Sequence, residues 1–141
     1  MGESAGGGKG NSIIKSMTRP DETSAYGAAT ALYQHPVYQW LHSIDAQTVL
    51  FTNRDWARIE AMISEALPGF YIFMMSERVN LTDYEYRICL LFRLGVKPKE
   101  CSTHLGVALP QVTRSSKEAL NKLFSVTGKG KDLMKRLQDI T

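Results

Sequence analysis

The stretch that decides the fold runs from residue 81 to residue 124 and reads LTDYEYRICLLFRLGVKPKECSTHLGVALPQVTRSSKEALNKLF. An apolar helical pattern ends at Gly95 and is followed by a short helix that starts near Pro98. The turn Leu105-Gly106-Val107 then leads into a basic helix over residues 109–124. This order predicts a helix-turn-helix, in which the last helix projects outward as a probe.

Signals at the ends of the first helix support this interpretation. Thr82 and Glu85 have the spacing of a capping box, and Gly95 is suited to a left-handed helix stop. The expected buried stripe of this helix comprises Tyr84, Ile88, Leu91 and Phe92. In the second helix the inward residues are expected to be Cys101, His104 or Leu105, and Val107.

Helical periodicity divides the basic helix into an inner and an outer face. If Val112 points inward, so do Ser116, Ala119, Leu120 and Leu123. The outer face then carries Pro110, Arg114, Lys117, Glu118 and Asn121, with Gln111 and Thr113 on its two flanks.

The outer face has the chemistry that duplex DNA requires. Arg114 can donate two hydrogen bonds to a guanine, Gln111 can pair with an adenine edge, and the Thr113 methyl can meet a thymine methyl. With Lys117, these are the candidate base-reading residues. The candidate phosphate contacts are Lys97, Lys99 and Lys122, together with the Lys129–Lys131 pair. The alternative is an ordinary solvated helix face.

The rest of the chain is also predicted to be helical. Residues 25–80 form a helical segment before the helix-turn-helix, with two short helices divided at His35-Pro36. A third, amphipathic helix has Asn53 as its expected N-cap and ends at Pro68-Gly69. Residues 70–78 are strongly apolar and are predicted to form a buried helix. Residues 1–24 are rich in Gly and Ser and are expected to be a flexible tail. Residues 131–140 form a last helix.

Length and composition indicate one compact unit with a loose end. The chain has 141 residues, of which 43% are hydrophobic, and no apolar run is long enough to cross a membrane. Two cysteines suggest no disulfide framework, and no signal peptide is evident, so we expect a cytoplasmic protein. Residues 81–141 contain 11 Lys and Arg but 6 Asp and Glu, which points toward a polyanionic partner.

The motif residues resemble a known family in order and spacing. Leu81-Thr82, Glu85, Leu94-Gly95, Lys99-Glu100, Leu105-Gly106-Val107, Val112 and Lys122-Leu123 resemble the DNA-binding domain of LuxR-type (GerE-like) transcriptional regulators. With Asp55-Trp56 and Pro68-Gly69-Phe70, the resemblance extends to the variant in the C-terminal tails of some bacterial sensor-regulator proteins.

The resemblance implies an all-α helical bundle with a C-terminal LuxR-type helix-turn-helix that binds double-stranded DNA. It also implies pairing through the last helix, so residues 131–140 are the candidate for a homodimer; packing into the core is the alternative. The chain departs from the family at two helix caps, where Lys97 and Ala108 replace Ser or Thr. A lost cap costs about 1 kcal/mol.

Two other function classes compete with DNA binding. The chain could be a protein-interaction module on a degenerate helix-turn-helix scaffold, with Tyr33, Tyr38 and Trp40 as its exposed patch. An enzyme is the weakest class, since no nucleophile, metal spacing or cofactor motif is evident, and neither is a small-molecule ligand. No cofactor is therefore expected.

Overall fold

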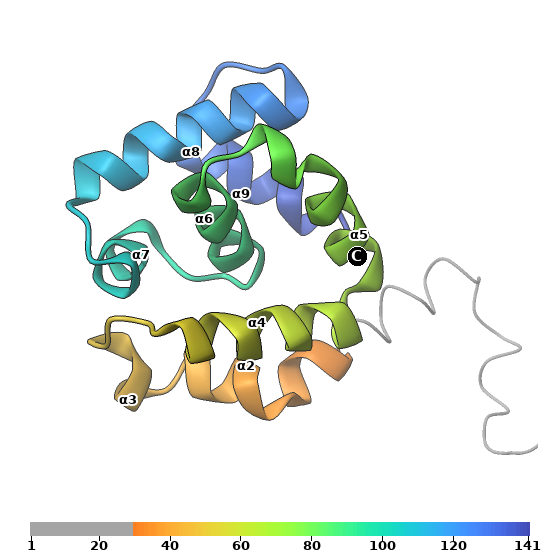
Figure 1. Ribbon diagram of the computed structural model, residues 1–141, viewed down its shortest axis with the longest axis vertical. Coiled ribbons are helices and arrows are strands. Elements are labelled where there is room, and N and C mark those ends of the chain that lie inside the picture. The colour runs from red at the N-terminus through yellow and green to blue at the C-terminus, as the bar shows by residue number, and fades with distance from the viewer. Residues whose placement is uncertain (1–29) are drawn as a thin grey trace, which may run out of the picture.

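The computed structural model describes residues 30–141, which contain helices and no strand (Figure 1). Residues 30–34 are helical, and the elements after them are α2 (Pro36–Leu41), α3 (Ile44–Gln47), α4 (Asn53–Ala66), α5 (Pro68–Glu77), the 3-10 turn η2 (Arg78–Asn80), α6 (Asp83–Arg93), α7 (Pro98–Leu105), α8 (Leu109–Phe124) and α9 (Gly130–Gln138). The expected tail at residues 1–24 lies outside the described residues. The prediction of an all-α fold is confirmed for residues 30–141.

Helix starts follow from local capping chemistry. At α6 the predicted capping box is present: the Glu85 backbone N–H donates to Thr82 Oγ1, and the Thr82 N–H donates to the Glu85 carboxylate. At α4 the prediction of Asn53 as the cap is wrong by one residue. Thr52 is the N-cap, because its hydroxyl and the Asp55 carboxylate form a second capping box.

The central element is α6, which packs against α7, α8 and α9 (Figure 1). Nearly all of its residues are buried, including Glu85 and Arg93 near its two ends. Tyr84, in the first turn, is 42% exposed, so its assignment to the buried stripe was wrong. A helix that is packed on several sides carries apolar residues around most of its circumference. A prediction of one buried stripe therefore names too few of its buried residues.

One hydrophobic core includes helices from both sides of residue 81. On the α4 side, Phe51 stacks on the His104 ring with 3.9 Å between centroids. The Phe51 N–H donates to the His104 carbonyl, and His104 Nδ1 lies 2.9 Å from the Val49 carbonyl, which accepts its proton. The loop before α4 is therefore attached to the end of α7, just before the turn.

The turn between α7 and α8 has the predicted backbone. Gly106 ends α7 with φ 69°, and the Val107 N–H donates to the Ser102 carbonyl at 3.0 Å. The helix α8 begins and ends at the predicted residues, Leu109 and Phe124. Neither Lys97 nor Ala108 makes a side-chain cap, as the sequence led us to expect, but Pro98 and Pro110 stand in the first turns. Proline has no N–H to satisfy there and its φ already suits a helix.

The segment over residues 70–78 is helical as predicted, but it is not a buried helix. In α5, Phe70 and Met74 are buried, whereas Ile72 is 67% exposed and Met75 is 37% exposed. Because α5 is apolar on all sides, the sequence pattern could not show which side packs against α4.

Candidate nucleic-acid interface

The outer face of α8 is formed as the sequence predicts. Thr113, Arg114 and Lys117 are exposed, and so are Pro110, Glu118 and Asn121. On the inner face, Val112, Ser116, Ala119 and Leu120 are buried against the neighbouring helices, while Leu123 is half-buried. Figure 1 shows α8 along the top of the bundle, with α6 and α9 below it. The exposed side chains therefore face away from the core.

Three of the candidate base-reading residues share one surface. Thr113, Arg114 and Lys117 line an open hollow on α8 together with Leu109, Pro110 and Glu118. The hollow thus combines two cations with one carboxylate. Leu109 is 44% exposed and was not among the candidates; an apolar residue beside a helix-opening proline is the signal that could have identified it.

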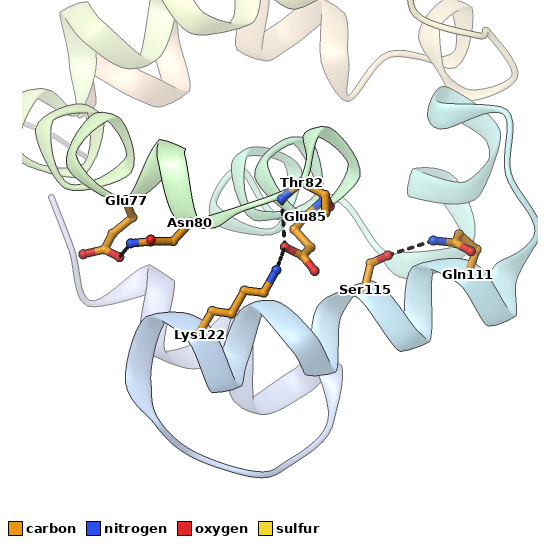
Figure 2. Close-up of polar contacts among 7 residues, drawn as sticks. All are labelled: Glu77, Asn80, Thr82, Glu85, Gln111, Ser115 and Lys122. Atoms are coloured by element: carbon orange, nitrogen blue, oxygen red, sulfur yellow. Dashed lines mark hydrogen bonds and ion pairs between the residues drawn. The ribbon is translucent and has the colours of Figure 1, made fainter.

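Gln111 lies on the flank, where its amide is engaged. Its Nε2 donates to Ser115 Oγ at 3.1 Å (Figure 2), and its Oε1 accepts from the Arg114 guanidinium. Gln111 is half-buried and Ser115 is buried. The two side chains with the greatest capacity to read bases are therefore joined to one another and aligned along the same helix.

Lys122 lies apart from the other candidate cations. Its Nζ contacts Glu85 Oε1 at 2.7 Å, in the capping box of α6 (Figure 2). This ion pair joins α8 to α6. Lys122 is thereby occupied within the bundle, a role that its sequence position did not indicate because Glu85 is 37 residues away.

The lysines at the start of α7 are exposed. Lys97 is the N-cap residue of α7 and Lys99 lies within its first turn. Neither forms an ion pair with any residue in the range 30–141. Lys129 and Lys131 are likewise exposed, at the start of α9.

The last helix uses its apolar stripe inside the molecule. Leu133 and Leu137 are fully buried, and α9 packs against α6 and α8. Met134 and Ile140 are half-buried and belong to the same core. This is the core-packing alternative to a pairing helix.

The aromatic residues before α4 do not form the exposed patch that the alternative function requires. Tyr33 is 57% exposed, but Tyr38 and Trp40 are half-buried against the core. The Trp40 ring packs against Phe51 and is covered by the Arg58 guanidinium, 4.7 Å from its centroid. Two of the three expected patch residues therefore serve packing.

Comparison of the chain with protein-family models, with curated proteins and with solved structures finds no match. The LuxR-type resemblance remains an expectation drawn from the motif residues of the sequence. Within residues 30–141, none of the helices has both the length and the apolar character needed to cross a bilayer.

Proposed function

We propose that this protein is a sequence-specific DNA-binding transcriptional regulator that acts in the cytoplasm through α8, as LuxR-type regulators do. The observation that carries the proposal is the alignment of Thr113, Arg114 and Lys117 along the exposed face of the helix that follows a left-handed turn at Gly106. A helix with its inner face buried and its outer face polar and basic suits the major groove.

Five side chains on α8 and two lysines near the start of α7 have defined roles in DNA binding. Arg114 and Gln111 read base edges, and they exchange their mutual hydrogen bond for bonds to the bases. Thr113 and the exposed Leu109 supply apolar contacts to thymine methyl groups. Lys117 contacts phosphate or a base edge, while Lys97 and Lys99 contact phosphates beside the turn.

Lys122 and the last helix are assigned no role at the DNA. Lys122 is paired with Glu85, so it is not assigned to phosphate. Pairing through residues 131–140 is not included, because Leu133 and Leu137 are buried within the chain and the exposed positions of α9 include Lys131, Lys135 and Arg136. Two copies that met through these cations would repel each other.

The test is fluorescence anisotropy of the full chain on a library of labelled duplexes across a salt series, followed by selection of the preferred sequence. The wild type should bind with a steep negative dependence on salt. Arg114→Ala should weaken binding by about 1–3 kcal/mol and relax the preference at one position, whereas Lys117→Ala should mainly reduce the salt slope by about 1.

Arg54→Ala is the matched control. Arg54 is exposed on α4, which Figure 1 shows on the other side of the bundle from α8. Its loss should leave affinity and sequence preference unchanged. Absence of binding to any duplex at low salt, or an equal effect of the Arg54 and Arg114 substitutions, would contradict the proposal.

Protein–protein interaction is the second candidate function, and a specific observation favours it. Ile72, Met75 and Val79 are exposed, at 67%, 37% and 88%, along α5 and η2. These apolar residues lie three and four positions apart, as on one helical face. If a second copy covers them, light scattering will give a dimer mass for the wild type and a monomer mass for Ile72→Ser/Val79→Ser.

A further inference from the structure

Arg93, at the end of α6, is buried and has no counter-ion among residues 30–141. Arg93 is 7% exposed. Its Nε donates to the Ile140 carbonyl at 2.9 Å, its Nη1 lies 3.3 Å from Gln138 Oε1, and its guanidinium is 5.9 Å from the centroid of the Phe70 ring. These contacts fix the position of the guanidinium, but all of its partners are uncharged.

The partners also leave part of the guanidinium free. Within residues 30–141, Arg93 forms no ion pair and its Nη2 has no hydrogen-bond acceptor. Burial lowers the pKa of Arg93, and the phenols of Tyr33 and Tyr38 oppose this effect. A buried charge without an anion is unfavourable, so a site of this kind gains free energy when an anion binds.

The guanidinium lines a small cleft. Tyr33, Tyr38, Leu32, Leu94 and Gln138 form most of the remaining wall, and the volume is about 110 Å³. The lining contains one cation and two phenols but no carboxylate. An engineered apolar cavity of about 150 Å³ admits benzene, and this cleft opens to solvent, so a molecule of that size can enter with one end protruding.

The walls of the cleft differ in chemistry. The rings of Tyr33 and Tyr38 are 5.3 Å apart and tilted by 52°, and their phenols are hydrogen-bond donors. Leu32 and Leu94 are buried aliphatic residues on the same cleft. The neighbouring His42 is already engaged, with its Nε2 2.8 Å from the Leu94 carbonyl. The donors that remain for a ligand are thus the guanidinium and the phenols.

We propose that this cleft binds a small carboxylate with a flat apolar body, such as an aromatic monocarboxylic acid. The carboxylate accepts from Arg93 Nη2 and a tyrosine hydroxyl, and the apolar body lies against Leu32, Leu94 and the tyrosine rings. The occupant bridges the helices before α4 to α6 and α9, the two helices that support α8. The site is separate from the outer face of α8, and its existence does not depend on DNA binding.

The test is a titration of the 141-residue chain with sodium benzoate, monitored by ¹H–¹⁵N NMR spectra that include the arginine Nε–H signals. Benzamide is the neutral control ligand, because it has nearly the same shape without the charge. We expect a saturable shift of the Arg93 signal and of the Gly95 and Gln138 amides with benzoate, a rise in Tm, and no comparable shift with benzamide.

Substitutions in the cleft test which side chains bind the carboxylate. Tyr33→Phe should weaken benzoate binding several-fold without loss of folding, since Tyr33 is 57% exposed. Arg93→Gln should abolish the shifts, with Arg54→Gln as the control that preserves them; should Arg93→Gln unfold, the double variant Tyr33→Phe/Tyr38→Phe replaces it. Shifts that do not saturate, that benzamide reproduces, or that survive these cleft substitutions would overturn the assignment.

Discussion

Lys122 Nζ and the backbone N–H of Thr82 share one acceptor, Oε1 of Glu85, at 2.7 Å and 2.9 Å. The same carboxylate oxygen thus caps α6 and holds α8 against it. The Glu85 side chain is 6% exposed, while that of Lys122 is 34% exposed. The ion pair that joins α8 to α6 therefore has a buried carboxylate and a partly exposed ammonium group.

Removal of this lysine should destabilise the bundle. Lys122→Met leaves the Glu85 charge buried with only backbone partners, and we expect a loss of about 1 kcal/mol, less than for a fully buried pair because Lys122 is partly solvated. Urea unfolding measures the change, and Lys117→Met, on the exposed face, is the control. Equal stability of the two variants would show that the ion pair contributes nothing.

A side chain at the turn glycine should strain the backbone. Gly106→Ala combines a positive φ of 69° with a Cβ that would lie 2.9 Å from Leu50 Cδ1, whereas at Gly95, with φ 82°, the nearest atom to a Cβ would be 3.9 Å away. We expect Gly95→Ala and Gly106→Ala each to cost about 1–2 kcal/mol from backbone strain, with only a small extra cost at Gly106 because the exposed Leu50 side chain must move aside. Leu50→Ala should remove the extra cost of Gly106→Ala and leave the cost of Gly95→Ala unchanged. Thermal unfolding of the two glycine variants, each with and without Leu50→Ala, measures this.

A restored cap should stabilise α8. Ala108 is exposed and has the extended backbone of an N-cap residue, with φ −72° and ψ 152°, but it has no side-chain acceptor. Ala108→Ser supplies one for the Gln111 N–H, which now donates to the Ala108 carbonyl at 2.9 Å; because Pro110 has no N–H, we expect a gain at the low end for a cap, about 0.5 kcal/mol. In Ala57→Ser, an exposed position within α4, serine should be slightly unfavourable. A melting temperature that does not rise for Ala108→Ser would contradict the expected capping geometry.

Two buried thiols should make the fold sensitive to alkali. Burial raises the pKa of Cys89 and of Cys101 above the ordinary value. When the pKa of a thiol is higher in the folded state than in the unfolded state, the folded state has its full stability below the unfolded pKa, about 8.5. This stability is lost as the pH rises above that value. Between pH 7 and pH 9 we expect the free energy of unfolding to fall by ~1.5 kcal/mol for the two thiols together.

Urea unfolding at the two pH values measures this loss. The double variant Cys89→Ala/Cys101→Ala is less stable throughout because of its cavities, but its stability should change much less with pH. Iodoacetamide should label the thiols only after unfolding, since both are buried. An identical pH dependence in wild type and variant would assign the effect to other groups.

Local signals made much of this fold predictable. Pro98, Gly106 and Pro110 mark helix ends by their backbone preferences, and the predicted limits of α8 are confirmed for this reason. The inner and outer faces of α8 also followed from periodicity, because the helix is strongly amphipathic. Thr52 was missed as a cap because Asn53, next to it, is an equally good capping residue.

Features that depend on distant parts of the chain could not be predicted. The partner of Lys122 is 37 residues away, and that of His104 is 55 residues away at Val49. Spacing rules connect residues three or four positions apart, so neither contact leaves a local pattern. The surroundings of Arg93 could not be predicted for the same reason. Its partners Gln138 and Ile140 become neighbours only after α9 has packed against α6.

The two faces of α8 are subject to separate constraints. Val112, Ser116, Ala119 and Leu120 are confined by the helices beneath them, whereas Thr113, Arg114 and Lys117 make no contact on which the core depends. Exchanges at exposed positions usually alter stability by less than about 0.5 kcal/mol. The outer residues are thus open to rapid evolutionary divergence, and variants with new surface chemistry can arise on this scaffold without first acquiring extra stability.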